Sequence, residues 1–137
     1  MKKILLFAFL LLTLVSYSQK KFDSKIIATL NDSVGLYEKV RIALINNEFI
    51  VKDNHNKDTL STYVREISGV GYVLIRAIIS GNSVTLAGVY GKKKLDIWGY
   101  TGSPKDYENI IYYKGSKTWK ILFKIGSSIA GEMTFSK

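Results

Sequence analysis

The chain of 137 residues contains no cysteine, one histidine and one proline. The absence of cysteine excludes disulfide bonds, thiolate nucleophiles, cysteine-ligated metal sites and a lipid anchor attached through cysteine. Small exported proteins often depend on disulfides, so this chain must be held together by side-chain packing and strand pairing. We therefore expect a core that stabilises the fold without covalent cross-links.

The single histidine, His55, lies in a polar segment at residues 53–58 that is rich in turn-forming residues. A histidine acting as a general base needs an orienting partner and a nucleophile, and no such pattern surrounds this one. The same segment lacks the glycine and the bidentate glutamate of a calcium-binding loop. The sequence therefore predicts no catalytic residue, no metal site and no cofactor.

Four carboxylates lie on or beside predicted strands and leave a small hydrolase open as an alternative. They are Asp96, Asp106, Glu108 and Glu132. Catalysis by a carboxylate pair needs two of them at a defined separation, which the sequence does not fix. Because each alternates onto the polar side of its segment, we expect solvated surface carboxylates.

The first 18 residues have the three parts of a secretory signal peptide. Two lysines open the segment, residues 4–15 are almost wholly apolar, and Ser16 and Ser18 place small side chains before Gln19. The apolar run is shorter than the roughly 20 residues that span a bilayer. We therefore expect cleavage before Gln19, a secreted or periplasmic protein, and no transmembrane segment in the mature chain.

Cleavage leaves residues 19–137, and this length of 119 residues is typical of one domain. The whole chain has 20 basic and 11 acidic residues, and loss of the two lysines in the signal peptide lowers the formal net charge from +9 to +7. Such an excess attracts polyanions without specificity. The abundance of residues with A/T-rich codons, lysine among them, is an alternative source of this charge.

Short segments of alternating polar and apolar residues follow one another along the mature chain, at the spacing of strands in a meander. We expect strands at residues 36–44, 49–51, 59–67, 72–79, 83–90, 95–100, 107–113, 119–125 and 129–135. Residues 80–83 have a tight-turn sequence and should join their two neighbours into a hairpin. The sequence predicts an all-β fold, a small antiparallel meander of about eight or nine strands that forms a barrel or a sandwich.

Two of these strands are predicted to bury one face each. The buried faces are Leu36, Val40, Ile42 and Leu44 in the first, and Trp119, Ile121, Phe123 and Ile125 in the second.

Residues 59–67 fit a helix by the spacing of their apolar residues, but their content of Thr, Tyr, Val and Ile favours a strand.

Three aromatic side chains are candidate ligand-binding residues, namely Trp98, Tyr100 and Tyr112. If Leu95 and Ile97 face the core, Trp98 and Tyr100 form an exposed patch suited to stacking on a sugar, a base or a protein. Packing of the same rings inside the protein is the alternative, because large aromatics seldom remain exposed.

Lysines gather at predicted turns and form the candidate polyanion-binding set. These residues are Lys92, Lys93, Lys94, Lys114 and Lys117, followed by Lys120 and Lys124 in the next segment. If the turns lie at one end of the sheet, the first five lysines form a cationic rim. Protection of turns and strand edges against aggregation is the alternative use of these lysines.

These observations favour an exported, non-enzymatic binding module for a small amphipathic ligand, a glycan or a protein partner. A polyanion-binding protein that uses the lysine rim, or a small hydrolase with a carboxylate pair, are the alternatives. An internal cavity would favour the binding module, clustered lysines without a cavity would favour polyanion binding, and two facing carboxylates would favour the hydrolase.

The signal-peptide prediction is tested on the exported protein. We expect its N-terminus at or near Gln19, because the small side chains at Ser16 and Ser18 mark the cleavage site. Mass spectrometry of exported material measures this N-terminus directly. Exported protein that retains residues 1–18 would contradict the prediction.

Overall fold

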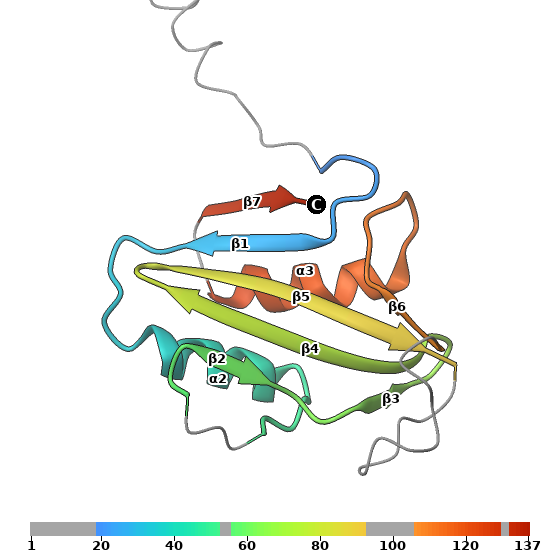
Figure 1. Ribbon diagram of the computed structural model, residues 1–137, viewed down its shortest axis with the longest axis horizontal. Coiled ribbons are helices and arrows are strands. Elements are labelled where there is room, and N and C mark those ends of the chain that lie inside the picture. Colours follow the sequence, from blue (N-terminus) through green and yellow to red (C-terminus); the bar gives the residue numbers. More distant parts are fainter. Residues whose placement is uncertain (1–18, 53–55, 93–105, 130–131) are drawn as a thin grey trace, which may run out of the picture.

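The computed structural model describes residues 19–52, 56–92, 106–129 and 132–137. In these residues the fold is mostly β, with one antiparallel sheet of seven strands and two helices that lie on the same side of the sheet (Figure 1). The predicted signal peptide and the predicted strand at residues 95–100 lie outside the described residues.

A long hairpin forms the centre of the sheet. β4 (Gly71–Ser80) and β5 (Ser83–Gly91) pair along nearly their whole length, and Ser80 lies opposite Ser83 across the turn. Gly81 has a positive φ of 59°, which glycine adopts without steric penalty and which suits a two-residue turn. The predicted hairpin is confirmed.

Short strands extend the hairpin on both sides. β1 (Lys25–Thr29) and β6 (Tyr107–Asn109) pair with opposite halves of β5. β2 (Thr59–Ser61) and β3 (Arg65–Ile67) pair with opposite ends of β4, which confirms strand structure in that segment. β7 (Glu132–Ser136) adds to β1.

The sheet is open, with the order β2-β4-β5-β1-β7. The expected barrel therefore does not form from the described strands, because β2 and β7 lie at opposite ends of this order. The layer that packs on the sheet consists of two helices, whereas a sandwich would place a second sheet there (Figure 1).

α2 (Leu36–Asn46) occupies a segment predicted as a strand, so that prediction is wrong. Leu36, Val40 and Leu44 are buried at intervals of four residues, and such even spacing fits both a strand and a helix. Ile42 distinguishes the two structures, because a strand would bury it with the others and the helix leaves it 46% exposed. The left-handed φ of 67° at Gly35 turns the chain into the helix.

α3 (Lys117–Ile129) is the second helix in place of a predicted strand. Alternation predicts Ile121 and Phe123 inside, but both are half-buried and Leu122 is fully buried. The Oγ of Ser116 accepts a hydrogen bond from the N–H of Trp119 at 3.1 Å, as an N-cap residue does. The buried face repeats at helical intervals and consists of Thr118, Trp119, Leu122, Ile125, Gly126 and Ile129.

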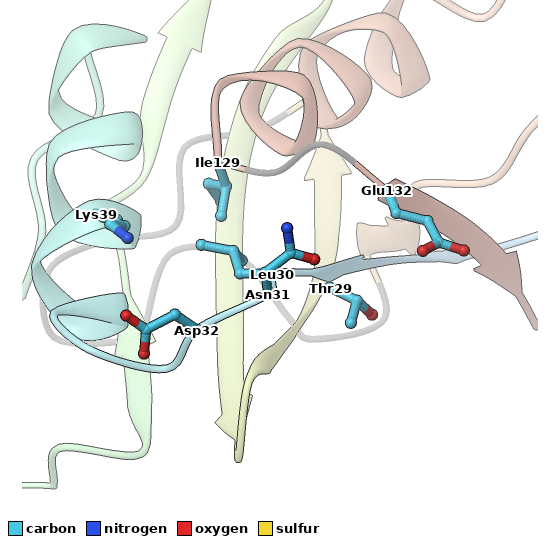
Figure 2. Close-up of a pocket in the computed structure, with 7 residues that line it drawn as sticks. All are labelled: Thr29, Leu30, Asn31, Asp32, Lys39, Ile129 and Glu132. Atoms are coloured by element: carbon cyan, nitrogen blue, oxygen red, sulfur yellow. The ribbon is translucent and has the colours of Figure 1, made fainter.

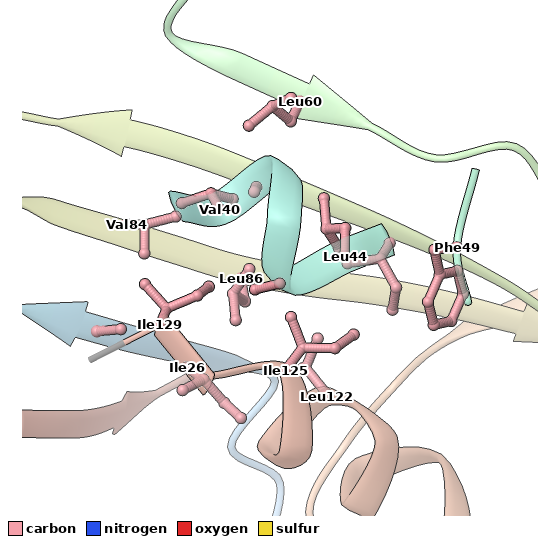
Figure 3. Close-up of a cluster of buried hydrophobic side chains, with 14 of the residues drawn as sticks. Ile26, Val40, Leu44, Phe49, Leu60, Val84, Leu86, Leu122, Ile125 and Ile129 are labelled. Atoms are coloured by element: carbon pink, nitrogen blue, oxygen red, sulfur yellow. The ribbon is translucent and has the colours of Figure 1, made fainter. Parts of the chain in front are cut away.

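The core lies between the sheet and the two helices (Figure 3). α3 packs on β1 and β5, while α2 packs on β4 and on α3. Gly126 permits the close approach of α3, because a Cβ atom there would lie 3.1 Å from side-chain atoms of Ile26 and Met133. Within the sheet, Gly88 leaves room for the side chain of Ile110, which would lie 2.7 Å from a Cβ atom at that position. Side chains from both layers therefore fill the interior.

Three alanine variants test the helical assignment of α3. Leu122→Ala should lower the free energy of unfolding by about 2–5 kcal/mol, because it leaves a cavity in the core. Ile121→Ala should cost clearly less, and Lys120→Ala should stay within about 0.5 kcal/mol of the wild type. Urea denaturation measures all three. A strand would bury Ile121 instead of Leu122, so a larger loss in Ile121→Ala would contradict the helix.

Candidate binding surfaces

One side of the sheet faces away from both helices (Figure 1). Its side chains come from alternate residues of paired strands, so the register defines which of them are neighbours. One row across five strands alternates threonine and isoleucine, in the order Thr59, Ile78, Thr85, Ile27 and Thr134. Ile78 is 46% exposed, and the other four are half-buried.

The neighbouring row carries two cationic side chains. Lys25 on β1 and Arg76 on β4 both lie opposite Ala87 of β5, which runs between them. Both charged side chains are exposed, and two inter-strand spacings, about 10 Å, separate them. Neither takes part in an ion pair within the described part of the chain.

An apolar pair, Leu74 and Val89, completes this surface. We call the surface the open face, and it consists of Thr59, Ile78, Thr85, Ile27, Thr134, Lys25, Ala87, Arg76, Leu74 and Val89. Because the strands are paired across the sheet, the backbone positions of these residues are fixed relative to one another. The open face therefore offers apolar side chains and threonine hydroxyls beside two positive charges.

A pocket of about 400 Å³ lies where β1 leads into α2 and where α3 leads into β7 (Figure 2). Four of its seven lining side chains are exposed polar or charged groups, so a ligand there would compete with water. One of these groups, Asp32, accepts a hydrogen bond from the N–H of Val34 at 2.8 Å and so belongs to the turn before α2. The four groups are Asn31, Asp32, Lys39 and Glu132.

Of the predicted aromatic residues, the structure describes Tyr112. This side chain is half-buried, and its ring meets the ring of Trp119 edge-on with centroids 5.7 Å apart. The N–H of Tyr112 donates to the carbonyl of Asp23 at 2.7 Å, and its carbonyl accepts from the N–H of Phe22 at 3.0 Å. Tyr112 thus anchors the N-terminal segment. Trp98 and Tyr100 lie outside the described residues, so the stacking patch stays a prediction.

Two of the five rim lysines, Lys92 and Lys117, adjoin one end of the sheet, next to the turn between β3 and β4. The Cα of Lys92 lies 3.8 Å from the position that a Cβ on Gly71 would occupy. The Nζ of Lys117 lies 3.6 Å from the corresponding position on Gly69. Lys114 is in the turn that leads into α3. The other two rim lysines, Lys93 and Lys94, lie outside the described residues.

Two of the candidate carboxylates lie far apart. Glu108 pairs with Tyr90 near the end of β5, whereas Glu132 pairs with Thr29, which pairs with Ser83 at the start of β5. Seven residues of extended chain separate those ends, about 23 Å, which is well beyond the spacing of a glycosidase carboxylate pair. Of the other two, Asp106 directly precedes β6, and Asp96 lies outside the described residues.

No group of three or more histidine, cysteine, aspartate or glutamate side chains that could hold a metal ion occurs in the described ranges. His55 is outside those ranges. Among the helices that the structure describes, none has the length and hydropathy to cross a membrane. Comparison of the chain with protein-family models, with curated proteins and with solved structures found no match.

The open face was not predicted from the sequence, although its signal is present in β4. Residues 72–79 are apolar on both sides of the strand except at Arg76. Such a run is typical of a central strand that is covered on both faces. Here helices cover one face, and on the other face the apolar side chains are half-buried or exposed.

Tyr90 makes the stability of the folded protein depend on pH. Burial raises the pKa of Tyr90 above its ordinary value, and so does the hydrogen bond that its hydroxyl donates to Glu108 at 3.0 Å. The folded state therefore binds this proton more tightly than the unfolded state does. The resulting stabilisation is present below the unfolded pKa of about 10 and is lost as the pH rises through the folded pKa.

Tyr90→Phe should make the alkaline fall in stability shallower, because the variant has no hydroxyl to ionise. At neutral pH the lost hydrogen bond should cost about 1 kcal/mol or less. Urea denaturation between about pH 7 and pH 11 measures both effects, with Tyr63→Phe at an exposed tyrosine as the control. An equally steep alkaline fall in wild type and Tyr90→Phe would contradict the assignment.

Proposed function

We propose that the mature chain is an exported, non-enzymatic binding module that binds a protein partner through the open face. The observation that carries this proposal is the row of alternating threonine and isoleucine beside the cationic row. Export rests on the signal-peptide pattern of residues 1–18.

The open face suits a macromolecular partner for two reasons. Burial of its half-exposed apolar side chains would contribute about 25 cal/mol for each Å² removed from water. Binding would also require little ordering of the backbone, since strand pairing already orders it. A small apolar ligand is less well supported, because side chains fill the space between sheet and helices and exposed polar groups line the pocket.

The charges on this face favour an acidic partner. Lys25 and Arg76 border the apolar rows without ion-pair partners in the described part of the chain. A partner with carboxylates opposite these two positions would gain attraction and faster association. A second copy of the chain is a poorer fit, because its open face repeats both cations and the expected mature net charge is +7.

Site-specific photocrosslinking in the exporting cell tests the surface. A crosslinking residue at Ile78 should give a discrete adduct with one protein, whereas the same residue at Ile42 on α2 should not. The comparison is matched, because both isoleucines are 46% exposed and they lie on opposite layers of the molecule. Combining Lys25→Glu with Arg76→Glu should lower the yield at Ile78 about tenfold, if charge complementarity contributes about 1.4 kcal/mol.

Two outcomes would overturn the proposal. Equal labelling at Ile78 and Ile42 would show that the open face has no preferred partner. Adducts between two copies of the chain, dependent on Ile78, would make the open face an interface for self-association. Light scattering of the purified protein provides the companion measurement, and we expect a monomer.

A further inference from the structure

Four lysines form one stripe along the outer side of α3 and the turn before it. Lys117, Lys120 and Lys124 follow one another at intervals of three and four residues, which places them on one side of α3, and Lys114 lies in the turn before the helix. All four are exposed, while the buried residues of α3 occupy the opposite side. We call these four residues the lysine stripe.

Within the described residues, no ion pair joins an acidic side chain to the lysine stripe. α3 contains no aspartate or glutamate, and the ion pairs in the described chain are Arg41 with Glu38 and Arg65 with Glu48. Arg65 differs from the lysines of the stripe, because its guanidinium is held by two partners. It pairs with Glu48 and donates to the carbonyl of Asn47 at 2.6 Å. The lysines of the stripe have no such partners within the described residues.

This arrangement opposes the electrostatic preferences of a helix. Like charges three or four residues apart repel one another, and cations near the N-terminus of a helix oppose its dipole. Lys117 and Lys120 lie in that first turn, where no acidic residue is present. An anion bound along the stripe would relieve both effects, so the helix is better suited to a bound polyanion than to water alone.

The rim lysine Lys92 extends the positive surface past the start of α3. Lys92 and Lys117 adjoin the same turn, through Gly71 and Gly69 respectively. The positive surface therefore runs from the end of the sheet along the helix. A ligand that uses its whole length must be an extended chain with repeated negative charges.

The side chains around the stripe indicate which class of polyanion the ligand belongs to. A helix that inserts into a lipid surface exposes large apolar residues, but Trp119 is 3% exposed and the half-buried Phe123 stacks on Phe135. Proteins that bind single-stranded nucleic acid provide successive stacking rings. Here the exposed ring next to the stripe is that of Tyr113, 47% exposed beside Lys114.

We propose that the lysine stripe binds an acidic polysaccharide, a linear sugar chain that carries carboxylate or sulfate groups. The ammonium groups contact the anionic groups along the chain, and the polar outer side of α3 remains hydrated. This site is separate from the open face, because the sheet and the core lie between them.

A matched pair of triple variants tests the site. One replaces the stripe, Lys117→Gln with Lys120→Gln and Lys124→Gln, and the other replaces exposed lysines elsewhere, Lys21→Gln with Lys39→Gln and Lys57→Gln. Both lower the net charge equally. The probes are heparin for sulfate groups and polygalacturonate for carboxylate groups, titrated calorimetrically over a range of salt concentrations. Circular dichroism confirms that each variant is folded.

The stripe variant should bind at least about tenfold more weakly than wild type near physiological salt, and the slope of log affinity against log salt should fall by about two, as expected for three lost contacts. The control variant should stay within about twofold of wild type. Equal losses of affinity in the two variants would show that binding depends on the net charge of the protein and not on the lysine stripe. No measurable binding by wild type at that salt, or tighter stripe-dependent binding to single-stranded DNA or to anionic vesicles, would overturn the proposed ligand class.

Discussion

The pairing of β4 with β5 is the constraint on which the other features depend. Successive residues of a strand point to opposite faces, so a slip of one residue would turn Arg76 into the core and Ile75 out of it. The two-residue turn at Gly81 fixes one end of the register. At the other end a Cβ on Gly71 would lie 2.5 Å from the carbonyl oxygen of Gly91, so only glycine fits that approach. The open face depends on this register, since it decides which side chains of β4 and β5 lie inside and which lie on that face.

The hairpin also explains why the molecule has two different sides. Its inner side accepts both helices, and Gly126 allows α3 to lie close to β1 and β5. Helix packing on that side buries Val73, Ile75 and Ala77 of β4 and Val84 and Leu86 of β5. No such layer covers the outer side in the described chain, yet that side retains Leu74, Ile78 and Val89. Apolar residues in fixed, half-buried positions are more typical of a binding surface than of a solvated one.

The sequence predicted the hairpin because two independent signals agree there, strongly β-forming residues and a tight turn at residues 80–83. It mispredicted α2 because buried residues four apart satisfy both a period of two and a helical period. In α3 the decisive residues are Leu122 and Gly126, which break the alternation of Trp119, Ile121 and Phe123. The apolar residues of α2 and α3 include many isoleucines, whose β-branching favours strands, and contact with the sheet overrode that preference.

The candidate surfaces were predictable to different degrees. Clustering of Lys92 and Lys117 follows from their predicted turns, and the structure places both beside one end of the sheet. The lysine stripe could not be predicted without knowing that this segment is a helix, because a strand would have placed Lys117 on the side opposite Lys120 and Lys124. The open face could not be predicted from the sequence either. It exists because no second layer covers that side of the sheet in the described chain, and this is a property of the whole fold that no local pattern encodes.

The two proposed surfaces are both cationic, which raises the question of whether occupation of one affects the other. The two surfaces lie on opposite layers of the molecule. The distance between them, across the sheet and the helices, exceeds the Debye length of about 8 Å at physiological ionic strength. Direct electrostatic coupling across that distance is therefore largely screened. An acidic protein on the open face and an acidic sugar chain on α3 would thus bind independently, and their free energies of binding would add.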